Sequence, residues 1–522
     1  MKMQSLLSAS AFLLAASASA EMQELDGDHH DGSRLYDERY RPQFHFSPPM
    51  HFMNDPNGLV YFKGTYNLYY QYNPLQLVAG NQNWGHATSS DLIHWKNLPI
   101  AIPNEPLTGG LIFSGSAVVD SNNTSGFFSG IPGGGLVAIY TLATYPPFAN
   151  PATQVQDIAY SLDNGVTYTK YSGNPVLDAH NSNFRDPYVF WYPPSQSWIM
   201  AVALANNHQI QIYSSSDLKK WKYLSSFGPA GSIGVAYEVP NLIHVPVEGT
   251  NQKKWVLLVS INPGAPQGGS ATQYFIGDFD GKSFTADDAV TRWMEFGKDA
   301  YAMETYNNLP ESQEQDVIAI TWVGNWQYAQ EVPTTPWRSA MSVPRFLTLR
   351  QTADGLILVQ KPISLASLRG ETLYNGSAQI TDASPVRISL EHDSSFEFET
   401  TVSADAKQQL NIDIRNWNGE KVTIGYNWDK QQLFLDRGDT RGFQNPYFTN
   451  DFASFLAPPN GQFKLHVLVD RSIIELYVND GERVATTVFF MEKPPSELRL
   501  SAKNGSVTVQ DLRVYSLKSI WR

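Results

Sequence analysis

After residue 45 the chain is made of short apolar runs, each bounded by Gly, Pro, Asn or Asp, and almost no stretch follows a helical period. The runs are rich in β-branched and aromatic residues, and their length suits single β-strands. Many short strands between turn residues favour a sandwich, a barrel or a propeller over an alternating α/β fold. The clearest strands we predict are 136–142, 198–204, 209–214, 255–261 and 317–323.

An internal repeat favours the propeller. The sequence SSDLIHW, which ends at Trp95, recurs as SSDLKKW, which ends at Trp221, and looser copies end at Tyr168 and Phe284. Repeats that are built from strands and recur every few tens of residues, as these four copies do, are typical of propeller blades. Because about five units of this length fit between residues 44 and 355, we predict a propeller domain there.

The pattern changes after residue 355. Later segments alternate apolar with polar residues, as expected for half-buried antiparallel strands packed in a sandwich. Since the segment after 355 has no partner in the repeat, we predict a linker over 356–372 and a β-sandwich domain over 373–522. The strands predicted in this domain are 396–402, 410–415, 433–435, 463–469, 473–478 and 498–501.

The first twenty residues resemble a secretory signal peptide. Lys2 precedes an apolar run over 6–16, and the residues 18–20, Ala-Ser-Ala, are typical of a cleavage site. This run is shorter than the about 20 residues that cross a bilayer. We therefore predict a signal peptide over 1–20, an N-terminal extension over 21–43, and a secreted protein that is not attached to a membrane. N-glycans are expected at the sequons of Asn122 or Asn123, Asn375 and Asn504.

Composition excludes several classes of function. The chain has 37 Lys and Arg against 50 Asp and Glu, a net charge of −13, which is the wrong sign for a nucleic-acid partner. It has no cysteine, so thiol catalysis and disulfides are excluded. Its 11 histidines are scattered without the spacing of metal ligands, so we expect no metal and no cofactor.

Three acidic residues stand out by their context: Asp55 in NDPNG, Asp186 in FRDP and Glu238 in YEVP. A proline directly after an aspartate pushes that aspartate into an extended conformation, and such dipeptides are also common in ordinary turns. Each of the three precedes the closing aromatic residue of its own repeat by a similar number of residues. We therefore expect the three carboxylates to come from three blades and to meet in one funnel.

Converging carboxylates are the groups that cleave a glycosidic bond. One carboxylic acid protonates the leaving oxygen, and one carboxylate attacks or activates water, through a cationic transition state. Crowding raises the pKa of neighbouring carboxyls, so one can stay protonated while another is ionised. Nearby rings are expected either to wall a sugar site or to belong to the core; they are Phe52, Trp84, Phe113 and Trp322.

At this point six motifs in order resemble glycoside hydrolase family 32, the family of invertases and inulinases. They are FMNDPNG, QYNP, WGHA, FSGS, FRDP and YEVP, and INPG and PWRS also look like the secreted members. The similarity runs from about residue 43 to the end of the chain. It implies a five-bladed β-propeller followed by a β-sandwich, in agreement with the reading from the repeat.

The resemblance also implies roles. Asp55 matches the nucleophile, Glu238 the acid/base, and Asp186 the residue that binds fructose hydroxyls and supports the transition state. The implied mechanism retains the anomeric configuration, with two carboxyls about 5–5.5 Å apart. With the aromatic Trp84 added, the predicted substrate-binding residues are Asn54, Gln71, Trp84, Phe113, Ser114, Arg185 and Trp322.

Two positions depart from the family pattern. Phe52 stands where the family usually has Trp, and Val239 stands where it commonly has Cys. Phe52 reshapes the pocket wall, and Val239 changes the surroundings of Glu238. Both bear on whether water or a sugar hydroxyl accepts the fructosyl group.

The leading hypothesis is a secreted β-fructofuranosidase acting on sucrose and short fructans. Fructosyl transfer to sucrose, exo-inulinase activity, an inverting glycosidase acting on pentose polymers, and a non-catalytic sugar-binding protein stay open as alternatives. A homodimer fits the resemblance, but no sequence feature marks an interface. Three further polar residues are expected to be solvated surface or loop residues, namely His51, Asp299 and Glu304.

Overall fold

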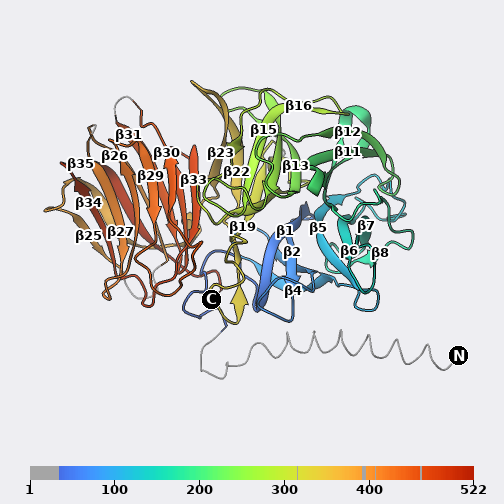
Figure 1. Cartoon of the computed structure of the whole chain (residues 1–522), viewed down its shortest axis with the longest axis horizontal. Coiled ribbons are helices and arrows are strands. Elements are labelled where there is room, and N and C mark those ends of the chain that lie inside the picture. The colour runs from blue at the N-terminus through green and yellow to red at the C-terminus, as the bar shows by residue number, and fades with distance from the viewer. Residues whose placement is uncertain (1–34, 314, 391–394, 406, 459–460, 522) are drawn as a thin grey trace.

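The computed structural model describes residues 35–313, 315–390, 395–405, 407–458 and 461–521. Strands make up almost all of the regular secondary structure in the described part, and they form a ring of sheets with a pair of stacked sheets beside it (Figure 1). The expected signal peptide and most of the expected N-terminal extension lie outside the described residues. Among the described residues, no helix has the length and apolar character that a membrane crossing requires.

Five sheets make up the ring within the described chain, which confirms the predicted five-bladed propeller. Blade 1 holds β1 (His51–Phe62), β2 (Thr65–Asn73), β3 (Asn83–Ser89) and β4 (Lys96–Ile102). Blade 2 holds β5 (Gly110–Val119), β6 (Leu136–Thr144), β7 (Thr153–Ser161) and β8 (Thr169–Lys170). Blade 3 holds β9 (Phe184–Tyr192), β10 (Ser197–Leu204), β11 (Gln209–Ser215) and β12 (Lys222–Phe227).

The last two blades carry extra short strands. Blade 4 holds β13 (Tyr237–Pro246), β14 (Lys253–Ile261), β15 (Ala271–Phe279), β16 (Phe284–Ala286) and β17 (Arg292–Trp293). Blade 5 holds β18 (Tyr301–Thr305), β19 (Ile318–Val323), β21 (Ala340–Met341), β22 (Arg345–Thr352) and β23 (Gly355–Pro362). Single 3₁₀ turns lie in the connections: η1 (Pro193–Ser195), η2 (Ala205–Asn207), η3 (Glu311–Gln313) and η4 (Ala366–Leu368). The five strands predicted for this domain coincide with β6, β10, β11, β14 and β19.

The segment expected to be a linker is mostly strand. β23 pairs with β22 along its whole length, from Gly355 to Pro362, and it completes blade 5. The next sheet already begins at Arg369, so the connection between the domains is short. A blade strand does not need the repeat motif, because hairpin pairing requires only an apolar face and a turn such as Asp354-Gly355.

The second domain is a sandwich of two six-stranded sheets, as predicted. One sheet holds β24 (Arg369–Ile380), β26 (Phe396–Ser403), β31 (Gln462–Val469), β32 (Ile473–Val478), β33 (Arg483–Val488) and β35 (Val507–Leu517). The other holds β25 (Val386–Ser389), β27 (Gln409–Arg415), β28 (Lys421–Asn427), β29 (Gln432–Asp436), β30 (Asp451–Ser454) and β34 (Glu497–Lys503). Apolar residues that alternate along these strands, such as Phe396, Phe398, Ile412 and Ile414, fill the space between the sheets.

Two features hold the first strands of the blades in place. The late strand β20 (Trp337–Arg338) pairs in parallel with the start of β1, which joins the chain after blade 5 to blade 1. Asn307, which follows β18, donates from Nδ2 to the backbone oxygens of Ala117 at 3.0 Å and Val189 at 3.1 Å. Its backbone N–H also donates to Leu59 at 2.9 Å. Asn307 therefore links blades 1, 2 and 3 to blade 5.

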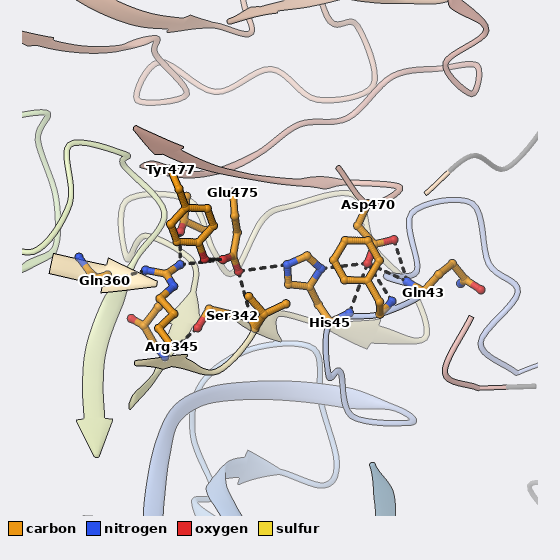
Figure 2. Close-up of polar contacts among 12 residues, drawn as sticks. Gln43, His45, Ser342, Arg345, Gln360, Asp470, Glu475 and Tyr477 are labelled. Carbon is orange, nitrogen blue, oxygen red and sulfur yellow. Dashed lines mark hydrogen bonds and ion pairs between the residues drawn. The ribbon is translucent and has the colours of Figure 1, made fainter. Parts of the chain in front are cut away.

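A buried ionic network joins the propeller to the sandwich (Figure 2). His45 lies between two carboxylates of the sandwich, with Nδ1 2.9 Å from Asp470 and Nε2 3.1 Å from Glu475. Arg345 of β22 donates to the other oxygen of Glu475 at 3.0 Å. Burial alone would lower the pKa of His45, but its hydrogen bonds to the two carboxylates raise it to about 9. The imidazole is therefore a cation at neutral pH.

Candidate active site

A bulge occurs near the start of the first strand of every blade. In each case the first strand advances three residues while the second strand advances two, so one residue is extra. Such bulges bend a strand and re-aim its side chains. The positions that flank the bulges are Met53 and Pro56 in β1, Ile112 and Gly115 in β5, Arg185 and Tyr188 in β9, Glu238 and Asn241 in β13, and Tyr301 and Glu304 in β18.

The bulges explain how Asp55, Asp186 and Glu238 come to the same level of the propeller. Each of the three lies at a bulge or directly beside one. Beyond the effect of burial, the structure brings their side chains close enough for the charges of Glu238 and Asp55 to raise the pKa of Asp186, and for the charge of Glu238 to raise the pKa of Asp55. A single repeated deformation of the first strand thus places carboxyls from three blades in one cluster.

The side chain of Asp55 is held from two sides. Ser114 Oγ donates to Oδ2 at 2.8 Å, and Asn54 Nδ2 donates to Oδ1 at 3.2 Å. Burial, and after it the charge of Glu238, raise the pKa of Asp55 to about 6, while these two hydrogen bonds act in the opposite direction. At neutral pH Asp55 is therefore an ionised carboxylate with a fixed orientation.

Asp186 sits in a left-handed backbone conformation, with φ of 65°. Its N–H donates to Thr141 Oγ1 at 3.0 Å, and its Oδ2 accepts from the N–H of Val239, also at 3.0 Å. Burial raises the pKa of Asp186 to about 7, although the Arg185 guanidinium lowers it and the other two carboxylates raise it further. Strained backbone of this kind is concentrated at functional sites.

Glu238 is the most accessible of the three carboxyls, with about a quarter of its side chain exposed. Oε1 accepts two hydrogen bonds from Arg185, from Nη2 at 3.0 Å and from Nε at 3.2 Å. Oε2 accepts a hydrogen bond from the phenol of Tyr301. The carboxyl is thus clamped between blades 3 and 5.

The cluster as a whole holds three carboxyls and a single guanidinium. Burial and the neighbouring negative charges raise the pKa of Asp55 to about 6 and of Asp186 to about 7, so an ionised carboxyl can stand beside a protonated one near neutral pH. The excess of negative charge also favours any positive charge that develops in a bound molecule. This arrangement can transfer a proton, attack an electron-poor carbon and stabilise a cation.

Three of the four rings predicted as possible walls are core residues in this structure, namely Phe52, Trp84 and Trp322. Trp84 is fully buried, stacks on Tyr69 with ring centroids 5.7 Å apart, and donates from Nε1 to the backbone oxygen of Phe113 at 2.9 Å. Trp322 is also fully buried. Trp84 therefore supports the strand beneath Phe113, whereas Phe113 itself is only half-buried. Gln71, on β2, is nearly buried too.

Both departures from the family pattern fall in one apolar cluster. Phe52 and Val239 are buried together with Tyr301, Ala302 and Trp322. The ring of Phe52 lies 6.4 Å from that of Trp322. The two unusual residues therefore form part of one packing unit behind the carboxyls and are not independent changes.

Three polar residues at the site were not predicted from the sequence. Tyr301 contacts Glu238, Thr141 holds the backbone of Asp186, and Gln154 accepts from Arg185 Nη1 at 3.4 Å. Tyr301 occupies the bulge of blade 5, as Glu238 does in blade 4. The alignment of first strands would have found it, but blade 5 lacks the repeat motif that allows such an alignment from sequence.

The expectation that Asp299 and Glu304 are solvated loop residues is wrong. Asp299 is fully buried and pairs with Arg437 of the sandwich at 2.6 Å. Glu304 is nearly fully buried on β18, and burial, followed by the charge of Asp55, raises its pKa well above the usual range. The residues that act on them, Arg437 for Asp299 and Asp55 for Glu304, lie in other elements and leave no local signal in the sequence. His51, expected on the surface, is half-buried at the start of β1.

Within the described residues, no group of three or more His, Cys, Asp or Glu side chains is arranged to hold a metal ion. The positive charge in the carboxyl cluster comes from Arg185, which contacts Glu238 at 3.0 Å and Asp186 at 3.9 Å. The groups that the described residues bring together here are carboxyls, a guanidinium and a phenol.

Clustered carboxyls at the mouth of a propeller, with one able to donate a proton and one to attack, define a site of the glycoside hydrolase type. Comparison with known proteins agrees with this class. The chain matches the N-terminal domain model of glycosyl hydrolases family 32 over residues 45–362 and the C-terminal model of that family over 364–516. The protein therefore belongs to glycoside hydrolase family 32.

Relatives with assigned activities cover nearly the whole chain. A levanase from Bacillus subtilis is 42% identical over 94% of this chain and 72% of its own length. An invertase from Schizosaccharomyces pombe is 41% identical over 94% of this chain and 87% of its own. An extracellular exo-inulinase from Meyerozyma guilliermondii is 41% identical over 92% and 96%.

Solved structures give the same result for the fold. The fructofuranosidase of Schwanniomyces occidentalis complexed with fructose superposes with a TM-score of 0.86, at 38% identity over 93% of this chain and 100% of that one. The exo-inulinase of Aspergillus awamori superposes with a TM-score of 0.85, at 37% identity over 93% and 100%. The resemblance noted from six motifs is confirmed over both domains.

Proposed function

We propose that this protein is a retaining β-fructofuranosidase that releases fructose from sucrose and short fructans. The observation that carries the proposal is the pairing of a fixed carboxylate, Asp55, with a more exposed carboxyl, Glu238, held between Arg185 and Tyr301. A retaining glycosidase needs one carboxylate to attack and one carboxyl to exchange a proton with the leaving group. The activities assigned to the relatives, all directed at fructosyl bonds, supply the substrate class.

In the first step Asp55 is the nucleophile. One oxygen of its carboxylate forms a bond to the anomeric carbon of the fructosyl unit, while the bond from that carbon to the leaving oxygen breaks. Glu238 gives its proton to the leaving oxygen, so the leaving sugar departs as a neutral alcohol. The result is a covalent fructosyl ester on Asp55 and an ionised Glu238.

In the second step Glu238 acts as a base. It takes a proton from an incoming water, whose oxygen bonds to the anomeric carbon as the ester bond to Asp55 breaks. Two inversions leave the configuration unchanged. We assign to Asp186 the binding of fructose hydroxyls and the stabilisation of the developing positive charge; its position beside Arg185 and its hydrogen bond from the N–H of Val239 support this role.

The test is product analysis by NMR during sucrose hydrolysis. The proposal expects β-fructofuranose to appear first and to mutarotate afterwards. Initial release of the inverted anomer would contradict the retaining mechanism and support an inverting one. Sugar binding without any release of fructose would support the non-catalytic alternative.

Fructosyl transfer is a second candidate activity. The observation that favours it is the shared cluster of Phe52 and Val239 behind the carboxyls. A change of packing there alters the wall of the pocket in which a sugar acceptor and water compete for the fructosyl group. Incubation with concentrated sucrose tests it: trisaccharide formation would support transfer, and free fructose equal to free glucose throughout would contradict it.

Secretion and glycosylation belong to the same proposal. Support for secretion comes from the leader-like N-terminus and from relatives named as extracellular exo-inulinases. Asn122, Asn375 and Asn504 are exposed, whereas Asn123 is half-buried and its side-chain oxygen accepts from Phe128 N at 2.7 Å. We therefore expect glycans at the first three positions and not at Asn123. Peptide mass analysis after enzymatic deglycosylation, with secretion measured in culture medium, tests both points.

A further inference from the structure

We infer that the turn over residues 145–148, between β6 and β7, is a binding platform for the sugar units on the leaving-group side of the scissile bond. The inference rests on the fructosidase function proposed above and extends it to substrate length. It concerns a surface that none of the predicted site residues occupies.

The turn lies at the same end of blade 2 as the carboxyl cluster. Thr144, the last residue of β6, pairs with Gly110, the first residue of β5. Ser114, which donates to Asp55, follows a few residues later on β5. The turn after Thr144 is therefore at the mouth of the propeller and not at its opposite face.

A chain of hydrogen bonds leads from the carboxyl cluster to this turn. Arg185, which binds Glu238, donates from Nη1 to Gln154 Oε1 at 3.4 Å. Gln154 in turn donates from Nε2 to the phenol oxygen of Tyr145 at 3.1 Å. Gln154 is almost fully buried, so it connects a fixed guanidinium to an exposed ring.

The turn exposes an unbroken set of apolar groups. Its sequence is Tyr-Pro-Pro-Phe, and all four residues are exposed, with Tyr145 at 38% and Phe148 at 58%. The ring of Tyr145 also lies 6.3 Å from that of Phe113 on β5. Exposed apolar surface continuous with a polar site is typical of ligand recognition, and the apolar faces of sugar rings fit flat aromatic groups.

The platform is held in place before any ligand binds. A side chain at Gly109 would place its Cβ 2.1 Å from the Phe148 ring, so glycine allows this ring to lie against the backbone. Tyr145 is oriented by its bond to Gln154. Little side-chain freedom is therefore lost on binding, which favours affinity.

The direction of the chain of contacts identifies the occupant. The group that protonates the leaving oxygen faces the leaving sugar, whereas the nucleophile faces the opposite side of the anomeric carbon. The hydrogen-bonded path to the platform starts at Glu238 and passes through Arg185 and Gln154. On the side of Asp55 the link is the packing of Tyr145 against Phe113, the residue before Ser114. The ligand of the platform is therefore the neutral sugar chain that departs, and longer chains should use it more than sucrose does.

The test compares two substrates in the full-length protein. The double variant Tyr145→Ala, Phe148→Ala is measured with sucrose and with a fructan tetrasaccharide, which has more sugar units on the leaving side. We expect the ratio of kcat/KM for the tetrasaccharide to that for sucrose to fall about tenfold, as the loss of two exposed rings that a bound sugar chain would cover predicts. Tyr145→Phe keeps the ring and loses the bond to Gln154, so this variant should retain most of the ratio.

The matched control is Tyr223→Ala, an exposed tyrosine on β12, the outer strand of blade 3. It should leave the ratio as in the parent. An unchanged ratio in the double variant, with both substrates still cleaved and the thermal midpoint retained, would overturn the platform. If the parent protein releases fructose from neither substrate, the proposed function itself fails, so the two failures are distinct.

Discussion

Two regions of this molecule bury carboxylates to nearly the same extent and give them opposite properties. At the mouth of the propeller, burial dominates and raises the pKa of Asp55 to about 6 and of Asp186 to about 7. At the junction of the domains, burial would also raise the pKa of Glu475, yet Arg345 and then His45 lower it to about 2. Burial alone therefore does not decide the state of a carboxyl in this protein.

The difference lies in the number of cationic partners. The junction supplies a guanidinium and an imidazolium to Glu475, and His45 also contacts Asp470 (Figure 2). The mouth supplies one guanidinium for three carboxyls. At the junction, each buried carboxylate has cationic partners, and the network is stable only while all of its members are present. At the mouth, carboxyls outnumber cations, and this leaves carboxyls whose pKa lies near the pH at which catalysis operates. The predictions below test this contrast, from the largest expected effect to the smallest.

Replacing the proposed nucleophile should abolish turnover without weakening the fold. In Asp55→Asn the ester cannot form, so kcat on sucrose should fall by about 10⁴-fold. The thermal midpoint should not fall, because the variant removes a charge that is repelled by Glu238. Steady-state kinetics and a thermal scan on the same preparation check both. Turnover within tenfold of the parent would reject the assignment of Asp55.

The matching change at the junction should have the opposite result. Glu475→Gln leaves Arg345 and His45 buried with one carboxylate fewer, and we expect a loss of about 3–5 kcal/mol in the free energy of unfolding. Activity per folded molecule should be retained, because the junction is not part of the carboxyl cluster. Denaturant unfolding is the measurement.

The control for that change is Glu399→Gln, on the same domain. Its carboxylate is well exposed and lies 3.4 Å from Arg369. An exposed pair contributes about 0–1 kcal/mol, so the unfolding curve should hardly move. Equal losses in the free energy of unfolding for the two variants would show that the buried network contributes no more to stability than an exposed ion pair.

His45 should make the stability depend on pH in the alkaline range. Its pKa is about 9 in the folded protein against 6.5 for an ordinary histidine, so its contribution is complete below 6.5 and is lost as the pH rises through 9. The shift corresponds to about 3 kcal/mol. Thermal midpoints measured from pH 6 to 10 should fall in the parent, and they should fall less in His45→Gln. Parallel curves would contradict a protonated His45.

The smallest effect concerns the acidic side of the pH profile of kcat/KM. The raised pKa of Asp55 means that kcat/KM should be lost as the pH falls through about 6, because the protonated acid cannot attack. Ser114→Ala removes a hydrogen bond that favours the ionised form. This side of the profile should then move to higher pH by about one pH unit. A profile that stays in place would show that Ser114 does not stabilise the charge.

The architecture was predictable from the sequence because it depends on local patterns. Alternating strands, turn residues and the SSDL repeat mark the blades wherever they occur, and the context of Asp55, Asp186 and Glu238 marks the site. The predicted strands of both domains were found. Each of these patterns spans only a few neighbouring residues, so it can be recognised in the sequence without knowing which strand is the partner.

What escaped prediction depends on partners distant in the chain. Asp299 looks like a loop residue until Arg437 of the sandwich is placed against it. Trp84 was expected to wall a sugar site, but the blade packing that surrounds it with Tyr69 and Tyr140 buries it completely. The bulge that carries Tyr301 was missed because blade 5 lacks the repeat motif. In each case the deciding contact joins separate blades or domains.

The pairing of β20 with β1 has a consequence for synthesis. The strand that carries Asp55 starts at His51, and its parallel neighbour is Trp337–Arg338. A ribosome that has made the first four blades has therefore not yet supplied the strand that closes the ring on blade 1, nor the sandwich carboxylates that bind His45. Because chains emerge N-terminus first, the ring that positions the carboxyl cluster cannot close on a nascent fragment, and fructosyl cleavage should begin only once nearly the whole polypeptide has been released.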